Sequence, residues 1–245
     1  MHIYLVSSGR KSVSTNLPNA LSIGNASVPL SDSVKNLGVM FDCHLTMRSQ
    51  VLNVVRAANF ELGRISSIRH LLSQEATITL ISAFVLSRLD YCNSLLSGCP
   101  QSLINQLQRV QNNAARLILK LPKRDHISHH LAALHWLPVN ARIQYKVSSL
   151  VYSTLRYNSP LYLSDLLSPY VPARTLRSSS DKSILCIPSN RTVTIGLKFF
   201  SYSAPKVWNS LPIHVRSSDS ISSFKSALKT HFFATTYGVP DSQPV

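Results

Sequence analysis

The feature of this sequence that comes closest to a binding site is a basic stripe between Arg109 and Lys120. Its polar members follow one another at spacings of four, three and four residues, which places them on one side of a helix, and two more cations follow in the motif LPKRD. Arginine and lysine are the residues that bind phosphate. The sequence therefore predicts phosphate contacts, and the alternative is a solvated helix face. The stripe and its extension consist of Arg109, Asn113, Arg116, Lys120, Lys123 and Arg124.

Four further cations stand close to the two tryptophans. Aromatic rings that stack on bases, next to arginines that hold phosphates, are typical of single-strand and RNA binding. Trp136 and Trp208 have apolar neighbours, so packing in the core is the favoured alternative. In the stretch SAPKVWNSLPIHVR we expect Trp208, Leu211 and Ile213 to anchor the last helix, with both cations of that stretch facing outward. These candidate nucleic-acid contacts are Arg142, Lys146, Lys206 and Arg216.

The carboxylates do not form a catalytic pattern. Nucleotide polymerisation requires clustered carboxylates that hold two divalent metal ions, whereas the 10 Asp and Glu residues here are isolated. Asp90 is the most tempting of them, but it comes late in a predicted helix with no second carboxylate nearby. The sequence contains no P-loop, nucleophile elbow, H-E-x-x-H or dinucleotide-binding glycine pattern. We therefore predict no catalytic residue and no cofactor.

Histidines and cysteines give weak support to a metal site. His126 and His130 are four residues apart in DHISHHLAALHW, so on one helix they could share a metal ion; the alternative is that these histidines face the core or water. The four cysteines lie far apart with no C-x-x-C pair, which disfavours structural zinc and favours free thiols in a reducing compartment. We predict no metal.

The composition favours a polyanionic partner. The 245 residues include 25 Lys and Arg against 10 Asp and Glu, a net charge of +15, and 44% are hydrophobic, enough to bury a core. No segment has the features of a signal peptide, and the longest apolar run, LISAFVL, is too short to cross a bilayer. We expect an intracellular protein, nuclear or cytoplasmic, with a nucleic-acid partner and no membrane or small-molecule substrate.

These side chains would be positioned by a mainly α fold with a small β part. Residues 1–44 predict a β meander of strands over HIYLV, LSIGNASVPL and VKNLGVMF. Residues 45–122 predict three helices: one from Leu45 to about Leu72, one capped by Ser73 that ends at SGCP, and one from Gln101 to Leu121. In the second helix Phe84 is expected to point inward.

The remainder predicts further helices and short strands. Residues 123–172 should contain a helix capped by Asp125, a helix that starts at Pro138 and buries Leu155, and a short helix in PLYLSDLLSPYVP. Residues 173–183 read as a linker within a C-terminal region 173–235. That region should hold strands at ILCIP and LKFFSYS, a short turn of helix at PKVWNSLP and a last helix from Ser220 to about Phe233, before a frayed tail at 236–245.

Six blocks in order resemble the C-terminal part of a LINE-type non-LTR retrotransposon reverse transcriptase polyprotein. The resemblance covers the chain from about Ser22 to Phe233. The blocks are VKNLGVMFDCHLTM, SRLDYCNSLLSGCP, LQRVQNNAARLIL, DHISHHLAALHWLPVNARIQYK, PLYLSDLLSPYVPARTLRSS and FFSYSAPKVWNSLPIHVR with SFKSALKTHFF.

The resemblance implies that the chain begins where the palm ends, downstream of the catalytic aspartates. Residues 45–121 would then be thumb-like helices, which in polymerases hold the template–primer duplex. The family's aromatic-x-Asp-Asp turn and its endonuclease are missing from this chain. We weigh three hypotheses: a catalytically incomplete fragment that retains RNA or primer–template binding, a degenerate relic without a biochemical role, and a protein-interaction module built from the helices.

Overall fold

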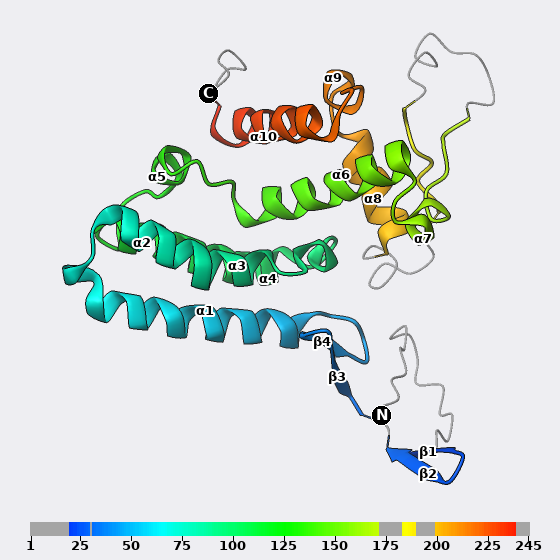
Figure 1. Ribbon diagram of the computed structural model, residues 1–245, viewed down its shortest axis with the longest axis horizontal. Helices are drawn as coiled ribbons and strands as arrows, with labels where there is room; N and C mark the ends of the chain where they lie inside the picture. Colours follow the sequence, from blue (N-terminus) through cyan, green and yellow to red (C-terminus); the bar gives the residue numbers. More distant parts are fainter. Residues whose placement is uncertain (1–19, 30, 172–182, 190–198, 239–245) are drawn as a thin grey trace.

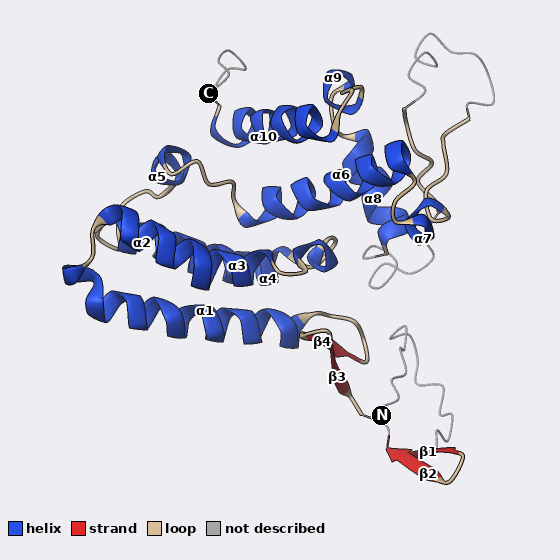
Figure 2. Cartoon of the chain, viewed as in Figure 1, coloured by secondary structure: helices blue, strands red, loops and turns tan. Residues whose placement is uncertain are grey.

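The computed structural model describes residues 20–29, 31–171, 183–189 and 199–238. The predicted strand HIYLV, almost all of the predicted linker 173–183 and the chain end from 239 lie outside these residues. Within them the fold is mainly helical, with a small antiparallel β part near the N-terminus, as predicted (Figures 1 and 2). Among the described helices, none has the length and hydropathy that a membrane-spanning segment requires.

Two separate β-hairpins precede the helices, in place of the single meander that the sequence suggests. The first pairs β1 (Ala20–Ile23) with β2 (Ala26–Pro29), and the second pairs β3 (Ser33–Asn36) with β4 (Val39–Asp42). The second hairpin packs on the first helix through β4, where Val39 is buried. The first hairpin stands away from the helices in Figure 1.

The first long helix and its neighbour form the lower layer of Figure 1. Helix α1 (Arg48–Ile68) continues into the short 3-10 turn η1 (Arg69–Leu71). The next helix is continuous but contains a π turn: α2 (Gln74–Ile81), η2 (Ser82–Leu86) and α3 (Ser87–Asp90). The Ser73 hydroxyl accepts a hydrogen bond from the Ala76 N–H at 3.1 Å, so the predicted cap is confirmed.

One inward prediction in this helix is wrong, because the buried face lies one residue later than the predicted face. The shift is already present before the π turn, where Thr77 and Ile81 are fully buried. Phe84, which sits inside this turn, is 47% exposed, whereas Ile81, Val85 and Leu89 are buried. The helix therefore keeps an inward face, but with a different register from the one predicted.

Helix α4 (Gln101–Leu119) follows the 3-10 turn η3 (Asn93–Leu96) and packs against α1 and α2. The 3.6-residue period predicts an apolar stripe on this helix, which is buried at its first four positions and half-buried at its last two. The positions are, in order, Leu103, Leu107, Val110, Ala114, Leu117 and Leu121. The helix ends at Leu119 because Lys120 adopts a left-handed backbone conformation, φ 54°.

Two predictions about the middle of the chain are wrong in detail. Helix α5 (Ser128–Ala133) begins after Ile127 with no side-chain cap, so Asp125 is not its cap. Helix α6 (Val139–Tyr157) begins directly after Pro138, but the prediction that it buries Leu155 is wrong: Leu155 is 43% exposed, and the adjacent Thr154 is the buried residue of the last turn. The short helix between prolines is α7 (Leu161–Ser164).

The C-terminal region is helical where strands were expected. The strand prediction for LKFFSYS is wrong from Phe200 onward, because α8 (Phe200–Asn209) buries Ala204 and Trp208, four residues apart on one helix face. In the described part of 173–235 the β contact is one bridge between Leu185 of ILCIP and Pro169. The remaining helices are α9 (Ile213–Arg216) and α10 (Ile221–Tyr237).

The last helix is longer than predicted. The helix starts directly after Ser220, close to the predicted start, and the Ser220 hydroxyl caps it by accepting from the Ser223 N–H at 3.1 Å. The helix continues through Tyr237, where a frayed tail was predicted, because the Tyr237 hydroxyl donates to the Trp136 carbonyl at 2.6 Å. The Tyr237 ring also packs against Phe233, with ring centroids 5.4 Å apart.

The core forms two hydrophobic clusters that meet along α6. The first spans β4, α1 to α5 and the start of α6; the second joins α6 to α8, α9 and α10. Helix α6 contributes Ile143 to the first cluster and Val147 and Val151 to the second. Figure 1 shows α6 between the α2–α4 layer and α10, so the fold brings the beginning of α6 beside the last helix.

Candidate nucleic-acid interface

The structure separates the nine candidate cations into exposed and partly buried groups. Three arginines, Arg116, Arg142 and Arg216, are partly buried and hydrogen-bonded to the protein. The exposed candidates are Arg109, Lys120, Lys123, Arg124, Lys146 and Lys206. Among the described residues the ion pairs use two carboxylates, Glu61 and Asp90, so none of these exposed cations is neutralised by a carboxylate there.

Arg142 forms a two-point ion pair with Asp90. Its Nε lies 2.8 Å from Asp90 Oδ1, and its Nη2 contacts Asp90 Oδ2. The fork geometry matches arginine to carboxylate in the way it would match arginine to phosphate. Arg142 is therefore a weaker phosphate candidate than the sequence suggested, and Asp90 serves as the counter-ion of an arginine.

Arg116 and Arg216 hold backbone segments in place. Arg116 Nη2 donates to the carbonyl of Asp125 at 3.2 Å, across the turn that follows α4. Arg216 donates from Nε to the Leu211 carbonyl at 2.9 Å and from Nη1 to the Ser183 hydroxyl at 2.6 Å. The expectation that Arg216 faces outward is wrong, because the loops around it present acceptors for its guanidinium group.

A polar groove between α1 and α4 contains the first member of the basic stripe. The groove has a volume of about 560 Å³, and Arg109 and Asn113 of α4 line it as predicted neighbours. Asn59 of α1 and Gln106 of α4 add side-chain amides. Amides and a guanidinium group offer several hydrogen-bond donors at once, which suits the oxygens of a phosphate–sugar backbone.

The turn after α4 presents the other exposed members. Lys120 closes the helix, and Lys123 and Arg124 follow on the exposed part of the turn. Arg69 was not recognised from the sequence: its buried guanidinium donates to the carbonyls of Leu117 and Ile118 at 3.0 and 2.8 Å. This arginine satisfies carbonyl groups at the end of α4 and so fixes the base of the cationic turn.

The tryptophans are core residues, which confirms the favoured prediction that they pack in the core and do not stack on bases. Trp136 is 8% and Trp208 2% exposed, so neither presents a face to a base. Trp208 Nε1 donates to the Ser183 carbonyl at 2.7 Å. Leu211 is buried as expected, but the inward prediction for Ile213 is wrong, because this residue is 58% exposed at the first position of α9.

The histidines are not arranged as one helical pair. His126 precedes α5, so it does not share a helix face with His130; the rings of His129 and His130 lie 3.8 Å apart at their centroids. Among the described residues no group of three or more His, Cys, Asp or Glu side chains is placed to hold a metal ion. All four cysteines are free thiols.

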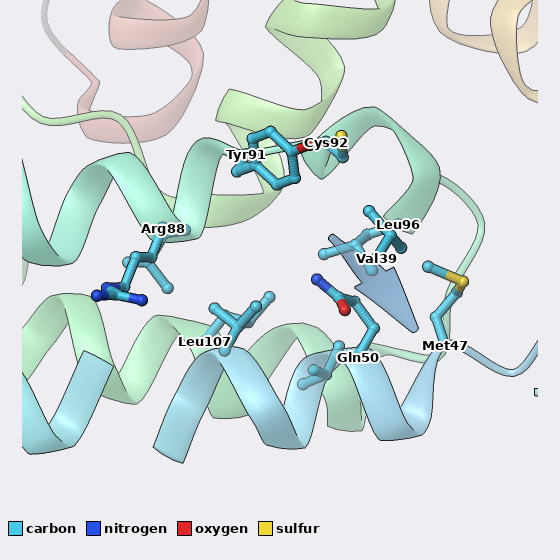
Figure 3. A pocket seen from close by; sticks show the side chains of 11 residues that line it. Val39, Met47, Gln50, Arg88, Tyr91, Cys92, Leu96 and Leu107 are labelled. Atoms are coloured by element: carbon cyan, nitrogen blue, oxygen red, sulfur yellow. The ribbon is translucent and has the colours of Figure 1, made fainter. Parts of the chain in front are cut away.

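A cavity beneath β4 is too small for a ligand. Its volume is about 10 Å³, room for roughly one water molecule, and its lining, which is mostly apolar, comes from β4, α1, α3, η3 and α4 (Figure 3). Gln50 lies beside it and accepts a hydrogen bond from the Met40 N–H at 2.9 Å. This contact attaches the second hairpin to α1 and is structural.

A larger cavity lies where α6 meets α3 and α10. Arg142 and Lys146 line it from α6, and Lys229 lines it from α10. The sequence did not identify Lys229, because it is 83 positions from Lys146 and only the packing of α10 on α6 brings them together.

Comparison with protein-family models, curated proteins and solved structures finds no match to this chain.

Proposed function

We propose that this chain is a catalytically incomplete part of a retrotransposon RNA-directed DNA polymerase that binds RNA or a primer–template duplex. The observation that carries the proposal is the run of exposed cations from Arg109 to Arg124, none of which is paired with a carboxylate of the described residues. The sequence resemblance supplies the kind of nucleic acid. The binding surface, called the α4 surface below, is the α1–α4 groove together with the turn after α4.

The α4 surface suits sequence-independent binding. Its donors are a guanidinium group, side-chain amides and lysine ammonium groups, which contact phosphate and sugar and do not read base edges. The tryptophans are buried, so base stacking by them has no part in the proposal. Affinity should therefore come mainly from release of counterions condensed on the nucleic acid.

Fluorescence anisotropy of the full chain with labelled RNA and with a primer–template duplex tests the proposal. The dissociation constant should rise steeply between about 50 and 200 mM salt. A variant with Lys120→Gln, Lys123→Gln and Arg124→Gln should lower the slope of log Kd against log salt by about 2 to 3, because each lost phosphate contact removes about 0.7–0.9. Affinity that does not depend on salt would contradict the proposal.

A charge-matched variant separates local contact from net charge. Lys35→Gln, Arg156→Gln and Lys225→Gln remove the same three charges from exposed positions outside the proposed surface. The salt slope of this variant should stay near that of the unaltered chain. Equal losses in the two triple variants would mean that the overall charge binds the nucleic acid and that the α4 surface does not.

The first hairpin favours a second candidate, a relic without a biochemical role. Its strands β1 and β2 pair with each other and stand apart from the helices, as strands would that have lost a larger sheet (Figure 1). Hydrogen exchange distinguishes the two candidates. Fast exchange throughout residues 20–42, together with absence of RNA binding, would support the relic; slow exchange in β3 and β4 with salt-dependent RNA binding would exclude it.

A further inference from the structure

The cavity between α6 and α10 is an open pocket with unbalanced positive charge. Its volume is about 380 Å³, within the range of roughly 300–1,000 Å³ typical of small-molecule sites. The end of α3, the η3 turn, the loop before α6, α6 itself and α10 all contribute to its wall. It therefore lies where the two hydrophobic clusters meet, and its shape depends on the packing of α10 onto α6.

The charge of the cavity resides in two lysines. Asp90 and Arg142 both line it and neutralise each other through their two-point ion pair. Lys146 and Lys229 are exposed and have no carboxylate partner among the described residues. The ammonium nitrogen of Lys229 lies 5.8 Å from the centroid of the Phe233 ring, a contact within α10 that leaves its hydrogen-bond donors available.

The other polar residues of the wall are Asn93, His135 and Tyr145. Two of them are suited to the non-phosphate part of a ligand. Burial raises the pKa of Tyr145, so its hydroxyl stays neutral and can donate a hydrogen bond. Asn93 is 5% exposed, donates from Nδ2 to Asp90 at 3.3 Å, and its Oδ1 accepts no hydrogen bond from any described residue. Leu137 adds an apolar surface.

We propose that this cavity binds the phosphomonoester of a nucleotide, with Lys146 and Lys229 as the phosphate ligands. A phosphomonoester carries close to two negative charges at neutral pH, which matches the two unbalanced lysines, whereas a phosphodiester carries one. Arg142 adds hydrogen-bond donors, but its charge is already neutralised by the ion pair with Asp90. Tyr145 and Leu137 face the sugar and base. The inference rests on the proposed function only where the phosphate belongs to the end of a nucleic-acid strand.

Calorimetric titration of the full chain tests the cavity directly. Adenosine 5′-monophosphate should bind, and adenosine should not. Lys146→Gln and Lys229→Gln should each weaken binding of the nucleotide by about tenfold or more, because each removes a charge-assisted hydrogen bond. Lys225→Gln, one turn earlier on α10 and outside the cavity, is the matched control and should leave binding unchanged. These lysines are exposed, so the variants should retain the unfolding midpoint of the unaltered chain.

Oligonucleotides distinguish the source of the phosphate. A short RNA with a 5′- or 3′-terminal phosphate should bind more tightly than the same RNA with hydroxyl ends if strand ends are the ligand, and Lys229→Gln should abolish the difference. Binding of the mononucleotide without an end effect assigns the cavity to a free nucleotide. If neither phosphate-bearing probe shows a preference, the cavity proposal is wrong, while salt-dependent RNA binding at the α4 surface would still stand.

Discussion

Helix α4 with its following turn and the segment α8–α9 carry similar residue types but use them differently. On α4 the inward amides are structural: Gln111 Nε2 donates to the Leu137 carbonyl at 2.9 Å, and Gln108 accepts from the Val139 N–H at 2.9 Å. Both bonds attach α4 to the start of α6. Arg109 of α4 and the cations of the following turn point outward and stay free of carboxylate partners among the described residues.

In α8–α9 the polar side chains hold another segment of the chain. Asn209 exchanges two hydrogen bonds with the backbone of Leu185, at 2.9 and 2.8 Å, and Trp208 donates to the Ser183 carbonyl. Arg216 also contacts Ser183. Lys206 is the exposed candidate cation of this segment. A basic stretch of sequence therefore forms a basic surface only where its side-chain N–H groups are not hydrogen-bonded to a neighbouring loop.

Removal of the Trp208 ring should have the largest effect on stability. The side chain is almost fully buried and lies 5.9 Å from the Phe224 ring, centroid to centroid, so Trp208→Ala should lower the free energy of unfolding by about 3–5 kcal/mol. Urea denaturation followed by circular dichroism measures the loss. At concentrations of denaturant where the variant stays folded, its affinity for RNA should be unchanged.

Trp208→Phe serves as the control for that variant. It keeps much of the apolar area but loses the hydrogen bond from Nε1 to Ser183, so the loss should be clearly smaller. A loss below about 1 kcal/mol for Trp208→Ala would show that α8 does not anchor the second cluster, and the contrast with α4 would fail.

A pair of arginine variants tests the contrast itself. Arg216→Gln should lower the free energy of unfolding by about 1.5–3 kcal/mol, because it removes charge-assisted bonds to Leu211 and Ser183, and it should leave the salt slope of RNA binding unaltered. Arg109→Gln should keep the free energy of unfolding within about 0.5 kcal/mol of that of the unaltered chain, and it should lower the salt slope of RNA binding by about 0.7–0.9. Denaturant titration and anisotropy on both variants provide the four values. Equal effects of the two variants on binding would contradict the contrast.

The sequence predicts the helices of this fold better than the contacts between distant elements. Long periodic segments such as α4 and α6 are recognisable because one apolar face must be buried, and caps such as Ser73 and Ser220 act on neighbouring residues. The LKFFSYS segment misleads because a short alternation of aromatic and serine residues fits a strand as well as a helix. What decides is the contact of Ala204 and Trp208 with distant α6, which no local pattern contains.

The candidate site is predictable only in its outward-facing part. The spacing of Arg109, Asn113 and Arg116 predicts one helix face from local geometry alone; Arg109 and Asn113 are exposed on it, whereas Arg116 is partly buried and bonded to the Asp125 carbonyl. The ion pair of Arg142 with Asp90 joins residues 52 positions apart, and the cavity adds Lys229 from the last helix. These partners are set by tertiary packing, so the sequence indicated the cations but not which of them remain available.

Asp42 is, like Arg69, a charged side chain of the N-terminal half that is used for structure. Its carboxylate accepts from the Thr46 N–H at 2.8 Å, the Met47 N–H at 3.0 Å, the His44 N–H at 3.3 Å and the Thr46 hydroxyl at 2.9 Å, which fixes the turn that leads into α1. Burial alone would raise the pKa of Asp42, but these hydrogen bonds outweigh it and the pKa lies below its ordinary value.

The pH dependence of Asp42→Asn provides the smallest and last test. Because the folded pKa is lowered, the carboxylate stabilises the protein above its unfolded pKa of about 3.9, and this contribution disappears as pH falls through the folded pKa. The variant should be less stable at pH 7 by at most about 1 kcal/mol, since water screens this largely exposed group. Denaturant titrations at pH 7 and near pH 3 should show the gap shrinking toward acid. A gap that is equal at both pH values would mean that the loss comes from the geometry of the amide, and that the ionised carboxylate does not hold the turn.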